Sequence, residues 1–167
     1  MNAQTHTQEK LWHMIKDIKF AMFTTQHVNG HLHSRPMTTQ NRSDDEDDSL
    51  WFFMSRKSDP VDDIVAHPTV NLSYADPDAD RYVSVSGEAR ISNDMVKRRA
   101  LWNKIAEAWF PDGVDDPDLT LVEVDIHHAH YWDVKQSKVR QLFTMAKAAV
   151  TGKPPSNMGE SGEVRMR

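Results

Sequence analysis

A series of short β-like segments separated by turn residues is the feature that most restricts the fold of this chain. Each segment is rich in β-branched or aromatic residues, and several alternate apolar with polar side chains. An Asn-Gly pair follows the first segment and predicts a tight antiparallel hairpin, because both residues tolerate positive φ. The predicted strands span residues 20–26, 31–40, 50–55, 69–75, 81–91 and 119–132.

Helices are predicted between and around these strands. Apolar residues recur at helical spacing over residues 7–18, 58–66, 93–109 and 139–150, with Ser58 and either Ser92 or Asn93 as N-caps. Gly87 predicts a bulge or bend in the fifth strand. Six antiparallel strands with a few inserted helices indicate a small β-barrel or α+β domain, because a βαβ protein would alternate strands and helices regularly.

Composition limits the class of protein. The chain has 167 residues, no cysteine and a formal charge of −5, which predicts one globular domain over residues 1–150 without disulfides or thiolate chemistry. Residues 151–167, rich in Gly, Pro, Ser and charge, are predicted to be a loosely ordered tail. We expect a cytoplasmic protein without nucleic-acid or membrane partners, because secretion signals, long apolar runs and a basic balance are all missing.

The second and third predicted strands both end in groups that suit an anion. Arg35 lies beside Pro36, which interrupts the strand ladder, and Thr38 and Thr39 follow. The third strand ends in four polar residues at a predicted helix start, where free N–H groups favour negative charge: Ser55, Arg56, Lys57 and Ser58. Each residue alone is more typical of a surface pair or a turn. Together they predict a phosphate held between two strands.

Two other groups of residues contain side chains that can bind cations, but their spacing does not favour a metal site. The acidic run within residues 42–49 is predicted to be a solvated hairpin connection between the second and third strands, and a calcium loop is not favoured because the Gly and distal Glu of such a loop are missing. The pairs His31 with His33 and His128 with His130 each share a strand face, as metal ligands would. No third ligand follows at a recognisable spacing, so no metal site is predicted.

The order of several short motifs resembles the general stress protein branch of the pyridoxamine 5′-phosphate oxidase-like, FMN-binding split-barrel proteins. The resemblance covers nearly the whole chain and rests on Arg35-Pro36-Met37, Trp51-Phe52-Phe53, Trp109-Phe110-Pro111 and Tyr131-Trp132-Asp133. It implies a mainly β, α+β fold: a six-stranded antiparallel split β-barrel with flanking helices. It also implies a homodimer with flavin at the subunit interface.

The resemblance assigns cofactor contacts residue by residue. Ring and phosphate contacts are implied for Arg35, Pro36, Met37, Thr38, Trp51, Phe52 and Phe53, and phosphate contacts for Ser55 and Ser58. Relatives commonly have Lys where this chain has Pro60, and Arg56 or Lys57 would then replace that cation. For the aromatic strand, plain core packing is the alternative interpretation.

Three functions stay open at this point. The first is an FMN-dependent oxidoreductase acting on an unknown small molecule, in which no protein acid or base is evident and the flavin carries the chemistry. The second is a flavin-binding or storage protein without turnover, and the third is a cofactor-free barrel. Pyridoxamine 5′-phosphate oxidase activity itself is not expected, because DVKQSKVRQLFTM follows Trp132 instead of an Arg-x-His-Asp-Arg segment.

Overall fold

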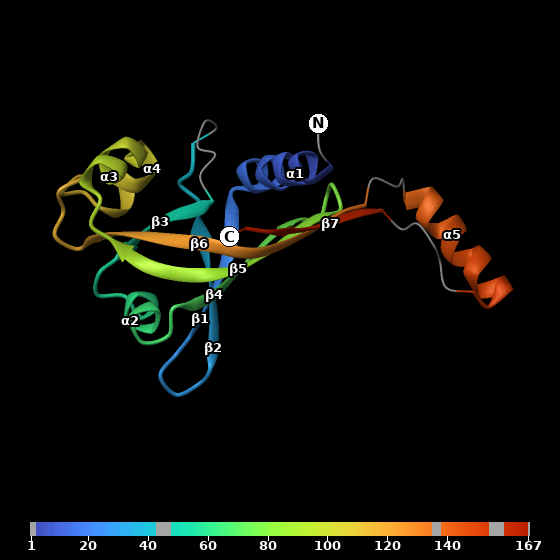
Figure 1. The fold of residues 1–167 in the computed structure, drawn as a ribbon, viewed down its shortest axis with the longest axis horizontal. Helices are drawn as coiled ribbons and strands as arrows, with labels where there is room; N and C mark the ends of the chain where they lie inside the picture. The colour runs from blue at the N-terminus through green and yellow to red at the C-terminus, as the bar shows by residue number, and fades with distance from the viewer. Residues whose placement is uncertain (1–2, 43–47, 135–137, 154–158, 167) are drawn as a thin grey trace.

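An open antiparallel sheet of seven strands forms the framework of the molecule (Figure 1). The computed structural model describes residues 3–42, 48–134, 138–153 and 159–166. The strand order is β2-β1-β4-β5-β6-β3, and β7 also pairs with β6. No ladder among the described residues joins β2 to β3, so the sheet is not closed. The predicted mainly β fold with flanking helices is therefore confirmed.

The strands follow the predicted segments closely, with one addition at the C-terminus. They are β1 Phe20–Gln26, β2 Leu32–Thr38, β3 Ser49–Ser55, β4 Thr69–Asp76, β5 Arg81–Ser92, β6 Leu119–Asp133 and β7 Glu160–Arg165. The helices are α1 Ala3–Ile18, α2 Asp59–Ala66, α3 Met95–Leu101, α4 Lys104–Trp109 and α5 Lys138–Thr151. The Asn-Gly hairpin is present, with Gly30 at a φ of 85°.

One face of the sheet carries the main core. Alternate residues of β1 point inward, and the α1 residues Leu11, Met14 and Ile15 pack on them at the predicted i, i+3, i+4 spacing. A second, smaller cluster lies under α3 and α4 and includes Trp51 and Phe53. The opposite face of the sheet stays largely uncovered within the part of the chain that the structure describes.

A β-bulge is present opposite Gly87, but its extra residue, His127, lies on β6 and not on the fifth strand as predicted, and it changes which residues of β6 face the core. The register shifts between Ser86, which pairs with His128, and Gly87, which pairs with Ile126. A Cβ at position 87 would lie 2.0 Å from the Asp125 carbonyl oxygen, so only glycine permits this approach.

The same bulge corrects the predicted face of β6. Simple alternation predicts that Val122, Val124, Ile126, His128, His130 and Trp132 share one side. The first three are buried in the core, but the extra residue turns the last three to the outer face. Ala129, Tyr131 and Asp133 are the residues buried in the second half of β6.

The single helix predicted over residues 93–109 is two short helices. Asp94, not Ser92 or Asn93, caps α3 by accepting from the Lys97 N–H. Asn103 interrupts the predicted helix because its side chain accepts from the Ile105 and Ala106 N–H groups and so begins α4. Asn103 Nδ2 also donates to Gln40 Oε1 (2.8 Å), which fixes the start of α4 beside the end of β2.

The C-terminal segment departs from the predicted loose tail. Glu160–Arg165 forms β7, and Val164 is buried in the main core. β7 pairs with the second half of β6, from His128 to Asp133, while β3 pairs with the first half. The strand was missed because its sequence, with two glutamates and a glycine, has low β-propensity.

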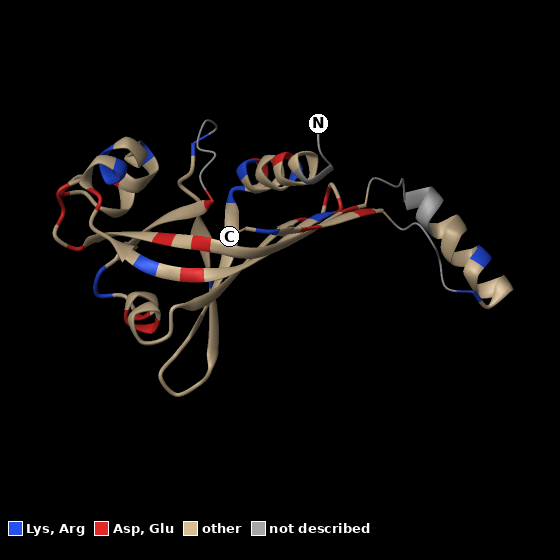
Figure 2. Ribbon diagram, viewed as in Figure 1, with Lys and Arg blue, Asp and Glu red and all other residues tan. Residues whose placement is uncertain are grey.

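Charged residues are distributed over several elements. Figure 2 shows the Lys and Arg positions scattered along helices, loops and strands, interspersed with Asp and Glu positions. The acidic run predicted as a solvated hairpin connection falls mostly on residues 43–47, outside the described part. The hairpin itself is wrong, because the flanking strands pair with other strands, β2 with β1 and β3 with β6. In the described helices, no segment has the length and apolar character of a membrane span.

Candidate functional site

A cavity of about 460 Å³ lies between β2, β3, α2 and α4. Its volume is in the range of small-molecule sites, and most lining side chains are apolar. It contains these predicted site residues: Arg35, Pro36, Met37, Thr38, Phe53, Ser55 and Ser58. Residues from two predicted strands and a helix start are therefore brought to one space.

A buried polar network fixes the cationic side chain of this cavity. Arg35 Nη1 donates to Thr25 Oγ1 (2.8 Å), and that hydroxyl donates to Asp63 Oδ2 (2.6 Å). Arg35 Nη2 lies 3.9 Å from the same carboxylate. A guanidinium has five donors, so this network orients Arg35 and leaves other donors for a ligand in the cavity.

Asp63 is the centre of this network. It is fully buried on α2, and His27 Nδ1 donates to its Oδ1 over 2.8 Å. Burial acts to raise the pKa of Asp63, but the hydrogen bonds from Thr25 and His27 and the nearby charges of His27 and Arg35 outweigh it and hold the pKa below its ordinary value. The carboxylate is therefore kept ionised behind Arg35.

The two serines of the predicted phosphate turn donate their protons within the protein. Ser55 Oγ donates to Asp118 Oδ2 (2.6 Å), and Ser58 Oγ donates to the Ser55 carbonyl (2.6 Å). Ser58 is the N-cap residue of α2 as predicted, but its side chain makes no capping bond. Asp59 and Asp62 already place negative charge in the first turn of α2, which disfavours a phosphate there.

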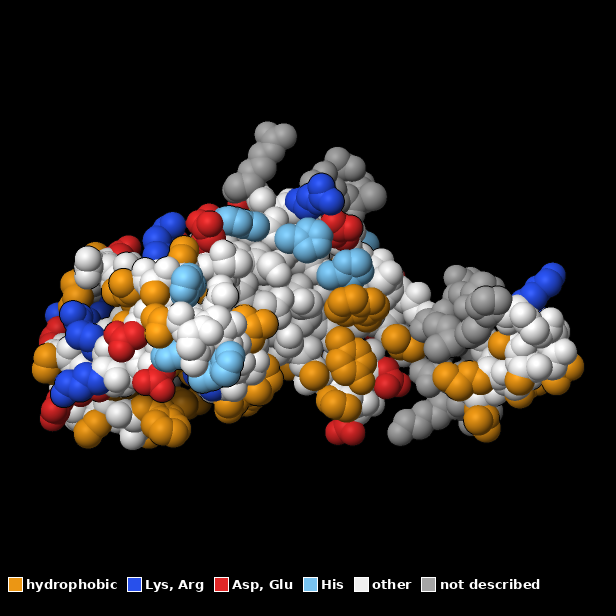
Figure 3. Space-filling view, turned by 90° about the horizontal axis from the view of Figure 1, so that it is seen from below, with side chains coloured by type: hydrophobic (Ala, Val, Ile, Leu, Met, Phe, Trp, Pro, Cys, Tyr) orange, Lys and Arg blue, Asp and Glu red, His pale blue; other side chains and the backbone are white. Residues whose placement is uncertain are grey.

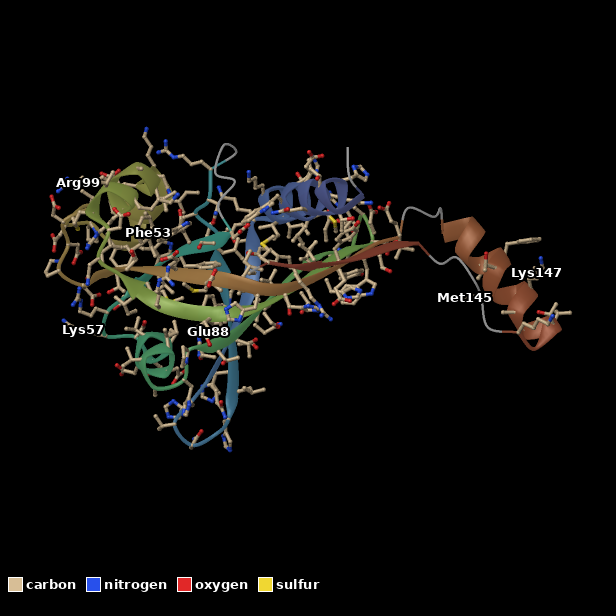
Figure 4. All side chains as sticks on the ribbon, in the orientation of Figure 1. Phe53, Lys57, Glu88, Arg99, Met145 and Lys147 are labelled. Carbon is tan, nitrogen blue, oxygen red and sulfur yellow. The ribbon has the colours of Figure 1, made fainter. Side chains whose placement is uncertain are left out.

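Four predicted contact residues lie outside the cavity lining. Phe52 is buried in the main core and meets Phe23 edge-on, at 5.1 Å between ring centroids. Trp51 packs in the second cluster, with Lys97 Nζ 5.2 Å from its ring centroid. Arg56 and Lys57 are exposed, and Figure 4 shows Lys57 on the turn between β3 and α2, away from Phe53. Core packing accounts for Trp51 and Phe52.

Several cavity residues were not assigned from the sequence. α4 and its C-terminal end contribute Ile105, Ala106, Trp109 and Phe110, and other segments contribute Gln40, Met54, Pro60 and Asp118. Trp109 is 79% exposed, which is unusual for the largest apolar side chain. Trp109 ends α4, the short helix that begins after Asn103 and that the helical spacing does not predict as a separate element.

Asp118 gives the cavity a second charged group. Its Oδ2 accepts from Ser55, whereas its buried Oδ1 has no hydrogen-bond partner among the described residues. A buried acceptor without a partner is costly, and because Oδ1 has almost no accessible surface it does not face the open cavity. The cavity lining therefore combines one guanidinium, one carboxylate that is bonded to Ser55, and a mostly apolar wall.

The outer face of the sheet forms a separate surface. The strand registers align Phe20, Ala75, Tyr82 and Trp132 in one row across β1, β4, β5 and β6. Phe20, Tyr82 and Trp132 are exposed by 63%, 38% and 42%. Figure 3 shows hydrophobic side chains beside histidines on one side of the molecule. Exposed apolar surface of this kind is typical of an interaction site.

Comparison with known proteins places these features in context. A family model described as pyridoxamine 5′-phosphate oxidase like matches residues 6–156. The chain is 30% identical over 145 residues to protein bli-3 of Neurospora crassa, covering 81% of this chain and 69% of that protein.

The chain is also similar to proteins of solved structure. The general stress FMN/FAD binding protein of Xanthomonas citri is 30% identical with a TM-score of 0.69, covering 80% of this chain and 92% of that one. A structure assigned to general stress protein 26 of Jannaschia sp. CCS1 is 24% identical with a TM-score of 0.74, covering 97% and 99% of the two chains. The latter likeness bears on the fold alone.

Proposed function

Because the chain belongs to the pyridoxamine 5′-phosphate oxidase-like family, we propose that it binds a phosphorylated flavin, FMN, in the cavity between β2, β3 and α4. The observation that carries this proposal is that Arg35 and Ser58, from separate predicted segments, line the same mostly apolar cavity. The FMN/FAD binding of the similar Xanthomonas citri protein supports it.

The cavity residues fit the two parts of such a cofactor. Arg35, held by Thr25 and Asp63, would bind the phosphate through charge-assisted hydrogen bonds. Met37, Phe53 and Trp109 would cover the ring system. Pro60 lines the cavity without offering a charge to the phosphate, so Arg35 would be its main cationic contact and we expect weak binding.

A bound flavin supplies hydride and electron transfer. The residues of this chain bind and orient the ring and limit the access of water, while the exposed side of Trp109 leaves the mouth open to a second small molecule. We therefore propose a flavin oxidoreductase of unknown substrate. Storage of flavin without turnover is the alternative.

We also propose a homodimer in which the outer sheet face is covered. The exposed row of Phe20, Tyr82 and Trp132 supports an apolar interface. Further exposed apolar side chains lie on α5, which extends beyond the end of the sheet in Figure 1: Leu142, Phe143, Met145 and Val150.

The absorption spectrum of the protein loaded with FMN tests this proposal. We expect a flavin spectrum that remains after desalting, quenching of tryptophan fluorescence on binding, and a loss of affinity of about 10- to 100-fold in Arg35→Ala, since a charge-assisted contact contributes about 1.5–3 kcal/mol. Arg90→Ala, which removes an exposed guanidinium paired with Glu123, is the matched control.

Two outcomes would decide between the alternatives. If neither FMN nor FAD binds to the wild-type chain, the flavin proposal is wrong. If FMN binds, steady oxidation of NADH or NADPH favours an oxidoreductase, and a stable bound flavin with neither donor oxidised favours storage.

A further inference from the structure

We propose that His128, His130 and Glu163 form a binding site for a divalent first-row transition-metal ion, with Zn²⁺ as the reference ion. The three residues lie on β6 and β7 and share no member with the flavin cavity. Each offers one ligand atom, and these atoms all lie within 4.8 Å of one another. The site is independent of the proposed flavin binding.

The backbone brings the ligands together in a simple way. His128 and His130 are two residues apart on β6, after the bulge, and therefore project from the same outer face. Glu163 is the direct cross-strand partner of His130 on β7. Directly paired side chains on one face of an antiparallel ladder start about 5 Å apart at Cβ, which is within reach of a shared ion.

One of the ligand-atom distances is already close to the value that a tetrahedral ion requires, and the others lie within 4.8 Å. Bonds of about 2.0–2.2 Å hold neighbouring ligand atoms about 3.3 Å apart. His128 Nδ1 already lies 3.4 Å from Glu163 Oε1, which is long for a hydrogen bond between them. Small side-chain rotations would bring the third ligand atom to the same spacing.

The surroundings favour ligation over a loose surface cluster. The His130 ring stacks on Trp132, with ring centroids 4.5 Å apart and planes at 22°, which restricts its rotation. Glu163 is also approached by Arg165 Nε at 3.1 Å, but that side chain is 81% exposed and its ion pair is correspondingly weak. An ion could therefore replace the guanidinium as the partner of Glu163.

The ligand set selects the class of ion. Two imidazoles and one carboxylate suit Zn²⁺, Co²⁺ or Ni²⁺, whereas Ca²⁺ and Mg²⁺ prefer oxygen ligands alone. Three protein ligands leave a fourth position for water. All three come from one chain, so the site does not require a second copy.

Titration of the untagged, metal-free full-length chain with Zn²⁺ by calorimetry, and with Co²⁺ by visible absorption, tests the proposal. We expect saturable binding of about one ion per chain and tetrahedral Co²⁺ bands. His130→Ala and Glu163→Gln should each lower the affinity at least about tenfold. Arg165→Ala should leave binding intact or strengthen it.

His127→Ala is the matched control, because this exposed neighbour lies near Asp125 (3.6 Å) and is not one of the three ligands. Circular dichroism of every variant separates lost ligation from lost folding. An absence of saturable binding in the wild-type chain, or an equal loss in His127→Ala and His130→Ala, would overturn the proposal.

Discussion

At the scale of single residues, the candidate site depends on the buried charge of Asp63, which does not itself line the cavity. Asp63 is buried, and the three side chains that neutralise and bond it include Arg35, the cation of the cavity. A buried carboxylate of this kind is stable only with its full set of partners, since desolvation opposes the charge. The position of Arg35 and the stability of the fold are therefore coupled through one residue.

Asp63→Asn should lower the free energy of unfolding by about 1–3 kcal/mol at neutral pH, because Thr25 and His27 lose a charged acceptor. Asp62→Asn, the same change at an exposed position of α2, should have little effect. Denaturant unfolding measures both, and equal effects of the two substitutions would contradict the assigned role.

The same residue predicts a sensitivity to acid. The folded pKa of Asp63 is below its unfolded value, so the folded state binds fewer protons at this site. Its contribution to stability is present above the ordinary carboxyl range and is lost as pH falls below about 4. The difference in stability between wild type and Asp63→Asn should therefore shrink from pH 6 towards pH 3, and a constant difference would exclude this linkage.

Pro60 is the second residue of interest, because it lines the cavity without offering a charge. Pro60→Lys should strengthen FMN binding by about tenfold or more, as expected for a new charge-assisted contact to the phosphate. Pro60→Gln, a neutral side chain of similar reach, separates the effect of charge from that of losing proline. Unchanged affinity in Pro60→Lys would mean that the phosphate lies elsewhere.

At the scale of elements, β7 is the segment that completes the structure. It covers the second half of β6 and places Val164 in the core. Its close fit depends on Gly162, because a Cβ there would lie 2.5 Å from the Tyr131 ring. β7 also carries Glu163, so the proposed metal site exists only while this strand is paired.

Gly162→Ala should therefore destabilise the chain by about 1–3 kcal/mol through steric overlap with Tyr131. Ser161→Ala, at an exposed neighbouring position, is the control. Thermal unfolding and hydrogen exchange of β7 amides measure the effect. Normal protection of β7 in Gly162→Ala would show that the ring can move aside without cost.

At the scale of the whole molecule, the uncovered sheet face is the main feature to explain. Its row of apolar side chains lies on the side opposite the main core, and α5 adds exposed apolar surface at one end. A single chain that leaves such a face in water is expected to associate. The proposed dimer would cover it.

Trp132→Lys should weaken that association, because it places a charge within the apolar row. Analytical ultracentrifugation over a range of concentrations should show a dimer in the wild type and a shift towards monomer in the variant. Val96→Lys, which changes an exposed apolar residue of α3, should not shift the equilibrium. A monomeric wild type would refute the proposed dimer.

The sequence by itself determined the strand segments along the chain, the hairpin at Gly30, the irregularity of the sheet at Gly87 and the segments that meet at the cavity. These features are local, because turn residues, alternation and helical spacing act over a few neighbouring positions. The motif order was also sufficient for the family, and its most useful single residue was Arg35.

Only the tertiary structure decided which side chains of those segments face the cavity and which partners they contact. Trp51 and Phe52 became core, the hydroxyls of Ser55 and Ser58 were bonded within the protein, and Asp63 and Asp118 entered as partners from distant positions. β7 formed although its own sequence disfavours a strand, because pairing with β6 and burial of Val164 outweigh its weak propensity. Such outcomes depend on contacts between residues far apart in the chain, which no local pattern encodes.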